Sequence, residues 1–257
     1  MYRYFIRLAF VGSNYHGWQV QNNAFTVQQQ LTEAIGIITG SDIQLTGCGR
    51  TDAGVHAKDF YAHFDYNRCF SRDEREKLLF RLNSFLPYDM VIKDIYPVRP
   101  DAHARFSAIF RTYEYKICRI KNPFSYGFAY NLNVHLDVDI MNKGAELLMT
   151  CKDFSSFAKT NSQVKTNICN LQFARWDGNE ELLTFTVTAN RFLRNMVRAM
   201  VGTLLDLGKG TIDIAMLQDI VATRSRSSAG YSVPACGLFL TEVIYPSEIF
   251  PGADNED

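Results

Sequence analysis

The chain has 257 residues, is 47% hydrophobic and 21% charged, and carries a formal net charge of zero. These values are ordinary for a soluble globular protein. No stretch approaches the roughly 18 consecutive apolar residues of a membrane-spanning helix, and the N-terminus lacks the layout of a signal peptide. We therefore expect a cytoplasmic protein with no membrane partner.

Zero net charge argues weakly against a nucleic-acid partner, because such domains are often basic overall. However, 17 of the 27 cationic residues are arginine, which binds phosphate through a planar fork. The six cysteines and five histidines show no CxxC or HExxH spacing. We expect reduced thiols, no metal and no disulfide framework.

Apolar and other side chains alternate over residues 2–11, which predicts a first strand. A polar loop follows, and Thr26 with Gln29 predicts the capping box of an amphipathic helix. Residues 43–47 then read as a short strand.

A further strand is predicted over residues 59–66. Ser71 and Glu74 repeat the capping-box pattern before the next helix. Residues 90–98 and 104–120 read as two more strands, the second of them long.

The second part of the chain repeats this mixture of elements. A helix over 140–149 precedes a hairpin over 169–190, whose turn is Asp177-Gly178-Asn179. Helices over 191–208 and 211–225 and a last strand over 237–246 follow.

Strands and helices recur in a similar order in both parts, which predicts an α+β fold with antiparallel or mixed sheets covered by helices. We expect two halves, residues 1–125 and residues 126–257. The first would carry the glycine-rich loop and the second the arginine-rich helix described next.

The stretch GCGRTDAGVHA lies between two predicted strands and is rich in glycine, with Gly47, Gly49 and Gly54. Glycines allow positive φ and close approach of another chain, and loops held by a sheet often carry catalytic groups. The spacings of phosphate-binding loops are absent. Composition thus leaves Asp52 as a candidate nucleophile or base, and the alternative is a plain turn in which Arg50 and Asp52 form a surface pair.

Three arginines, Arg191, Arg194 and Arg198, are spaced i, i+3 and i+7, which would place them on one face of the predicted helix over 191–208. Such a face is usually a solvated one. No acidic residue falls within it here, which favours a phosphate or carboxylate partner.

Arg105 and Arg111 interleave with four aromatic residues in the predicted strand over 104–120, namely Phe106, Phe110, Tyr113 and Tyr115. Aromatic rings stack on unpaired bases and arginines hold the phosphate backbone, so this pattern is typical of RNA binding. The alternative is a strand with one aromatic core face. Tyr113 and Tyr115 share a face, so we expect at least one of them in the core.

Several motifs together resemble those of the tRNA pseudouridine synthase A family, in the same order along the chain. They are YHGWQVQ, TVQQQL, GRTDAGVHA, HARFSA with RTYEY, DFSSF, ANRFLRNMVRAMVGTLL and GLFLTEVIYP. The similarity runs from about Tyr4 to Pro246, and GRTDAGVHA is its most specific block.

This resemblance implies an enzyme that isomerises uridine to pseudouridine at positions 38, 39 and 40 of the anticodon stem and loop of tRNA. It implies two similar α+β halves, with sheets joined around a central cleft. It also implies no cofactor, no metal, and a homodimer in which one tRNA contacts both subunits.

The resemblance also assigns roles to individual residues. Asp52 would be the catalytic nucleophile or base, paired with Arg198, and Arg50 would help to extrude the target base. Tyr113 would lie against the target uracil, and Leu238 would form part of the apolar pocket wall. The remaining arginines are candidates for contacts with the RNA: Arg191, Arg194, Arg105 and Arg111.

Two places depart from the family pattern. Asp59 and Phe60 stand where Gly-Gln is frequent, and Thr166, next to Lys165, stands where relatives carry arginine. These departures leave the proposed chemistry intact and bear on the tRNA contacts.

Two other classes of function compete. A non-catalytic RNA-binding module would explain the arginines and aromatics but not Asp52, because a carboxylate repels phosphates. A carboxylate-dependent hydrolase would explain Asp52 but would require a second carboxylate, for which Asp59 is the nearest in sequence.

Overall fold

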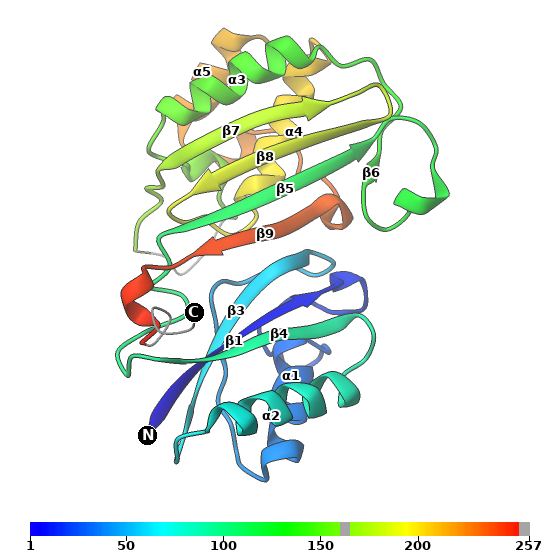
Figure 1. The fold of residues 1–257 in the computed structure, drawn as a ribbon. Helices are drawn as coiled ribbons and strands as arrows, with labels where there is room; N and C mark the ends of the chain where they lie inside the picture. The colour runs from blue at the N-terminus through cyan, green and yellow to red at the C-terminus, as the bar shows by residue number, and fades with distance from the viewer. Residues whose placement is uncertain (160–164, 252–257) are drawn as a thin grey trace. The chain divides into compact units, whose positions relative to one another are not determined.

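The computed structural model describes residues 1–159 and 165–251, and the chain divides into two units that are described separately (Figure 1). Unit 1 contains Met1–Ile109 and the chain from Leu240 onward, and unit 2 contains Phe110–Phe239. The chain therefore passes from unit 1 to unit 2 after Ile109 and returns to unit 1 after Phe239, whereas the sequence suggested a single boundary after residue 125.

The sheet of unit 1 is antiparallel. The strand β1 (Tyr2–Phe10) lies between β3 (His56–Tyr66) and β4 (Met90–Val98), and the short β2 (Thr46–Gly47) pairs with β3. The predicted strand over 43–47 thus keeps only its last two residues.

Two helices, α1 (Val27–Thr39) and α2 (Arg72–Phe85), cover one face of this sheet (Figure 1). Thr26 caps α1 by accepting a hydrogen bond from the backbone N–H of Gln29, which is one half of the predicted capping box, and the Gln29 side chain donates to Glu33 Oε1 at 2.9 Å. The capping box of Ser71 and Glu74 is complete in α2. Four alternate residues on one face of β3 are buried: Phe60, Ala62, Phe64 and Tyr66.

The opposite face of this sheet is covered as well. Phe5 is fully buried because the rings of Tyr245 and Phe250 pack edge-on against it, at centroid distances of 5.2 and 6.0 Å. The C-terminal segment therefore supplies a second cover that the alternation in β1 did not predict.

The sheet of unit 2 contains β5 (Phe110–Cys118), β8 (Leu182–Ala189) and β7 (Leu171–Gly178) in antiparallel order, with β6 (Tyr130–Asn131) parallel to β5. The predicted hairpin forms, but its turn lies over 179–181, because Asp177 and Gly178 still pair with β8. The Asn179 side chain accepts hydrogen bonds from the backbone N–H groups of Glu181 and Leu182. The last strand, β9 (Leu238–Ile244), has its first two residues in unit 2 and the others in unit 1.

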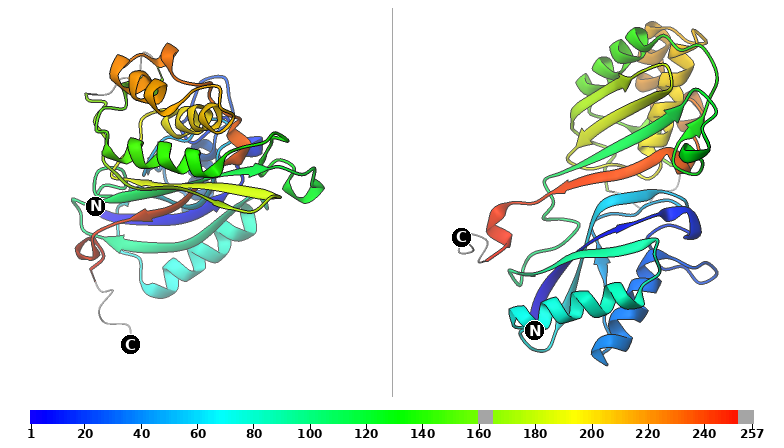
Figure 2. Two further views of the ribbon diagram at one scale, coloured as in Figure 1. Left: turned by 90° about the horizontal axis from the view of Figure 1, so that it is seen from above. Right: turned by 45° about the vertical axis from the view of Figure 1, so that its right-hand side comes forward.

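Three helices lie on one face of the unit 2 sheet: α3 (Val138–Thr150), α4 (Met196–Gly208) and α5 (Ile214–Thr223) (Figure 2, left). The order strand, helix, two strands, helix, strand occurs in unit 1, and the same order with β6 added after β5 and α5 added after α4 leads from β5 to β9, which agrees with the similar order that the sequence suggested. Short 3-10 helices link the elements, at Gly12–Asn14, Pro123–Ser125, Ser155–Phe157, Arg226–Ser228, Ala235–Gly237 and Ser247–Ile249. None of the helices that the structure describes is long and apolar enough to cross a bilayer.

Two further predictions of element limits were wrong. The helix predicted from residue 191 begins at Met196, because Asn195 has left-handed backbone with φ of 66°, which a continuing α-helix excludes. Arg191 and Arg194 precede α4, so they do not form a helical stripe with Arg198.

The strand predicted over 104–120 begins only at Phe110. Residues before it form a turn, because the backbone N–H of Ser107 donates to the carbonyl of His103 at 2.9 Å. Arg105 and Phe106 therefore lie on a turn in unit 1, and Arg111 and Tyr113 lie on β5 in unit 2.

Candidate active site

The candidate catalytic loop of unit 1 joins β2 to β3 and ends in a tight turn. Asp52 is half-buried, and its carbonyl accepts a hydrogen bond from the N–H of Val55 at 3.2 Å. Gly54 makes this turn possible with φ of +79°. Arg50 is exposed two residues before Asp52.

A second loop of unit 1, containing the YHGW motif, holds the catalytic loop in place. The N–H of Trp18 donates to the carbonyl of Thr51 at 3.4 Å, and the N–H of Gly54 donates to the carbonyl of Tyr15 at 3.3 Å. At Gly17, any Cβ would overlap with the carbonyl oxygen of Thr51. The motif pointed only to a family, and its structural role was not predicted, although glycine is the residue that permits such a close approach of two backbones.

The glycines of the catalytic loop do different things. A Cβ on Gly47 would lie 2.5 Å from Trp18 Cε2 and 2.9 Å from Phe60 Cζ, so this glycine serves packing and not RNA clearance. At Gly49, by contrast, no described heavy atom lies within 4 Å of the Cβ position. Gly49 therefore fits the expected role of leaving room for an incoming backbone.

Both departures at residues 59 and 60 are core features. Asp59 is buried, its Oδ1 lies 2.6 Å from Arg7 Nε, and its Oδ2 accepts a hydrogen bond from the N–H of Val243 at 3.4 Å. Phe60 is fully buried and stacks on Trp18 at 4.2 Å. The carboxylate that the hydrolase alternative required is thus engaged in a structural ion pair.

In unit 2, Arg198 lies in the first turn of α4 and is half-buried. Its Nε donates to the carbonyl of Val233 at 2.7 Å, and the N–H of Val233 donates back to the Arg198 carbonyl at 3.3 Å. The hydroxyl of Tyr115 donates to the carbonyl of Pro234 at 2.8 Å. The segment before β9 is therefore fixed to both α4 and β5, and Leu238, which is buried, follows it as the first residue of β9.

The preceding loop is held by residues that the sequence did not single out. Arg226 Nη1 donates to the carbonyl of Gly230 at 3.0 Å, and Nη2 donates to Ser232 Oγ at 2.8 Å. The N–H of Gly230 donates to Thr203 Oγ1 at 2.9 Å, which ties the loop to α4. The bonds of Arg226 are local and close the loop on itself, whereas the bond between Gly230 and Thr203 joins residues 27 positions apart and has no local pattern by which it could be recognised.

Tyr113 is half-buried on β5, opposite Val187 of β8, and its ring lies edge-on to Phe192 at a centroid distance of 5.1 Å. Tyr115 is fully buried, which confirms the expectation that at least one of the two tyrosines belongs to the core. Tyr113, Arg198 and Leu238 are all in unit 2, whereas Asp52 and Arg50 share one loop of unit 1.

The candidate RNA contacts of unit 2 lie partly together. Arg111 Nη1 donates to the carbonyl of Asn190 at 2.9 Å, directly before Arg191, so these two arginines are at the same end of β5 and β8. Arg194 is exposed, and its carbonyl accepts from the N–H of Lys159 at 3.0 Å.

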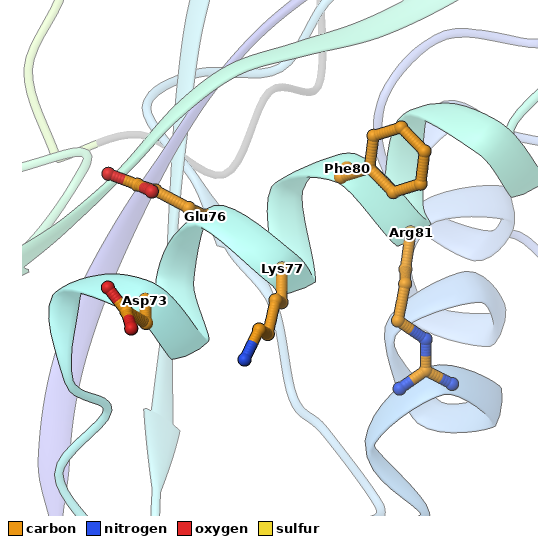
Figure 3. A pocket seen from close by; sticks show the side chains of 5 residues that line it. All are labelled: Asp73, Glu76, Lys77, Phe80 and Arg81. Atoms are coloured by element: carbon orange, nitrogen blue, oxygen red, sulfur yellow. The ribbon is translucent and has the colours of Figure 1, made fainter.

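A hollow of about 440 Å³ lies on the outer face of α2 (Figure 3). Its lining residues are Asp73, Glu76, Lys77, Phe80 and Arg81, and none of them is a predicted site residue. Among residues 1–159 and 165–251, no group of three or more histidine, cysteine or acidic side chains is placed to hold a metal ion.

Comparison with known proteins places these elements in a family. Residues 145–246 match the family model described as tRNA pseudouridine synthase. The tRNA pseudouridine synthase A of Parabacteroides distasonis is 44% identical over 254 residues, covering 99% of this chain and 100% of the relative. Those of Bacteroides fragilis and Porphyromonas gingivalis are 45% and 47% identical, covering 96% and 97% of this chain and 98% and 100% of the relatives. The chain therefore belongs to the tRNA pseudouridine synthase A family, whose members are isomerases.

Proposed function

We propose that the protein converts uridine to pseudouridine at positions 38, 39 and 40 of the anticodon stem and loop of tRNA, with Asp52 as the catalytic nucleophile or base. Similarity to relatives named tRNA pseudouridine synthase A along almost the whole chain supports the reaction. The observation that carries the assignment of Asp52 is its position: it is half-buried on a turn that is hydrogen-bonded on both sides to the loop containing the YHGW motif.

The reaction breaks the N1–C1′ glycosidic bond, turns the base and joins C5 to C1′, so that the hydrogen on C5 is lost to solvent. A carboxylate serves each conceivable route: addition to C6 of the uracil, attack on C1′ of the ribose, or proton abstraction on the way to a glycal. In every route the carboxylate must be ionised and correctly oriented. Fixing the backbone on both sides of Asp52 restricts where its side chain can reach.

The proposal gives Arg198 the role of supplying positive charge that favours the ionised form of Asp52. Its Nε bond to the Val233 carbonyl fixes the side chain, and its position in the first turn of α4 fixes its Cα.

The target base must leave the RNA stack, which costs a few kcal/mol. Arg50 is exposed on the catalytic loop and is proposed to occupy the vacated space. Tyr113, half-buried, and Leu238, buried, are proposed to contact the flipped uracil and hinder its escape while it turns. Affinity independent of sequence would come from the remaining arginines on phosphates.

We also propose that the protein is cytoplasmic, uses no cofactor and acts as a homodimer. A mass in solution close to twice 29.3 kDa would support the dimer. A mass equal to that of one chain, measured with and without tRNA, would refute it.

Release of tritium from tRNA labelled at C5 of uracil tests the proposed reaction. Pseudouridine formation releases this hydrogen, whereas RNA binding or phosphodiester hydrolysis does not. We expect release that stops when uridines 38, 39 and 40 are all replaced by cytidine. No release from any anticodon-arm uridine would refute the proposal.

A further inference from the structure

The four aromatic residues that sequence reasoning connected with RNA differ sharply in exposure. Phe106 is 75% exposed, Tyr115 is fully buried, and Phe110 and Tyr113 are half-buried. An exposed phenylalanine is not unusual by itself. The turn that displays Phe106, however, is held by hydrogen bonds to the side chains of His63, His103 and Ser107.

His103 organises this turn through its side chain. Its Nδ1 accepts hydrogen bonds from the N–H of Arg105 at 3.1 Å and of Phe106 at 3.4 Å. The N–H of His103 donates to Ser107 Oγ at 2.9 Å, and the N–H of Ser107 donates to the His103 carbonyl at 2.9 Å. The backbone that carries Arg105 and Phe106 is therefore fixed before any ligand binds.

The turn is anchored to the sheet of unit 1 through a second histidine. The rings of His63 and His103 lie 4.7 Å apart, and the Nδ1 of His63 accepts from the N–H of Ala104 at 3.1 Å. Burial lowers the pKa of His63 to about 4 and also lowers the pKa of His103. Both rings are therefore neutral near pH 7, and both Nδ1 atoms keep the lone pair that these bonds require.

The surroundings of the Phe106 ring suit a nucleobase. The His103 ring lies 4.4 Å from it, and the guanidinium carbon of Arg105 lies 5.6 Å from its centroid. Bases stack on aromatic rings in single-stranded RNA, and a neighbouring arginine adds a charge for the phosphate. Because the turn is already ordered, less conformational entropy is lost when a base binds to Phe106.

We propose that Phe106 stacks on an unpaired base of the tRNA substrate while Arg105 contacts a phosphate beside that base. This inference rests on the proposed function, to which it adds a specific base-stacking contact on the 103–107 turn of unit 1.

The experiment measures tRNA affinity for Phe106→Ala across a salt series, with Phe80→Ala as the matched control. Phe80 is 71% exposed on α2, so the control removes an equally exposed ring elsewhere in unit 1 (Figure 3). We expect Phe106→Ala to weaken binding by roughly 5- to 150-fold with an unchanged salt slope, because stacking does not release counterions. Phe106→Trp should restore binding, and Arg105→Ala should lower the salt slope by about one.

Equal affinities for Phe106→Ala, Phe80→Ala and the unmodified protein would overturn the inference. A loss of affinity accompanied by a lower mass in solution or a lower melting temperature would also overturn it, because Phe106 would then be a contact between proteins or within the fold. Tritium release by the unmodified protein is measured alongside. If release occurs and Phe106→Ala behaves like Phe80→Ala, only the stacking contact fails, whereas absence of release removes the proposed function itself.

Discussion

The backbone carbonyl of Thr51 lies so close to Gly17 that any Cβ on Gly17 would overlap with its oxygen. Gly17 also has φ of +85°, which other residues rarely adopt. This contact fixes the residue directly before Asp52, so that the YHGW loop sets the position of the candidate nucleophile.

Gly17→Ala is therefore expected to lower both stability and turnover. The backbone strain alone costs roughly 1–2 kcal/mol, and the overlap forces the catalytic loop to move. Gly40→Ala is the control, because Gly40 has φ of +67° but no described heavy atom within 4 Å of its Cβ position. Thermal melting should show a loss of stability in both variants. Tritium release should show a loss of turnover only in Gly17→Ala. Full turnover in Gly17→Ala would mean that the contact does not position Asp52.

Thr51 provides a test of the loop's hydrogen bonding. Its Oγ1 is buried and has no hydrogen-bond partner among the residues described, and such a group costs about 1–3 kcal/mol. Thr51→Val should therefore leave the free energy of unfolding unchanged or raise it. Thr203→Val should lower it, because Thr203 Oγ1 donates to the Ala199 carbonyl and accepts from the N–H of Gly230, both at 2.9 Å. Urea denaturation measures the free energy of unfolding of both variants. A similar decrease in Thr51→Val and Thr203→Val would contradict this account of Thr51.

His63 gives a pH dependence with a definite sign. Burial, and then the charges of His103 and Arg3, lower its pKa from 6.5 to about 4. Between these two pH values the unfolded chain binds a proton at His63 that the folded chain excludes. The contribution of His63 to the free energy of unfolding is therefore fully present above pH 6.5. It falls as the pH drops towards 4, by up to about 1.4 kcal/mol per pH unit. His63→Asn should flatten this part of the stability profile, and His135→Asn, at an exposed position, should not. Equal slopes of the free energy of unfolding against pH in the unmodified protein, His63→Asn and His135→Asn would refute this role of His63.

Arg198 and Arg194 are expected to behave differently. Arg198→Ala should reduce turnover by about 100-fold or more with a smaller change in tRNA affinity, as removal of charge stabilisation in a reaction does. Arg194 is exposed outside α4, and Arg194→Ala should mainly weaken binding and lower its salt slope. Single-turnover kinetics with separately measured affinities distinguish the two, and a pure affinity loss in Arg198→Ala would make it a phosphate contact.

Much of the fold could be predicted because its signals are local. The caps at Thr26 and Ser71 and the hairpin turn at Asn179 depend on residues within a few positions, and all three are present. The start of α4 could not be predicted, because Asn195 takes left-handed backbone while its side chain donates to Ser232 Oγ, 37 residues later. The apolar residues on both sides of Asn195 predicted a longer helix than the one that forms.

The candidate site also contains features that could be predicted from local sequence and features that could not. GRTDAGVHA was predicted as a loop between strands, and it joins β2 to β3. The orientation of Asp59 could not be read from sequence, because Arg7 and Val243, which bind its two oxygens, are 52 and 184 residues away. Gly17 and Thr203 also act through partners, Thr51 and Gly230, that only the folded chain brings near.

Tritium release from tRNA labelled at uracil C5, measured for Asp52→Ala and Asp59→Asn, tests the central claim most directly. Asp59→Asn weakens the ion pair with Arg7, whose side chain is partly exposed, and should lower stability by roughly 1–3 kcal/mol, while the folded fraction keeps its turnover. Asp52→Ala should bind tRNA nearly as well as the unmodified protein and release no tritium. Tritium release that persists in Asp52→Ala would contradict the assignment of Asp52, and loss of release in folded Asp59→Asn at the same time would point to Asp59 instead.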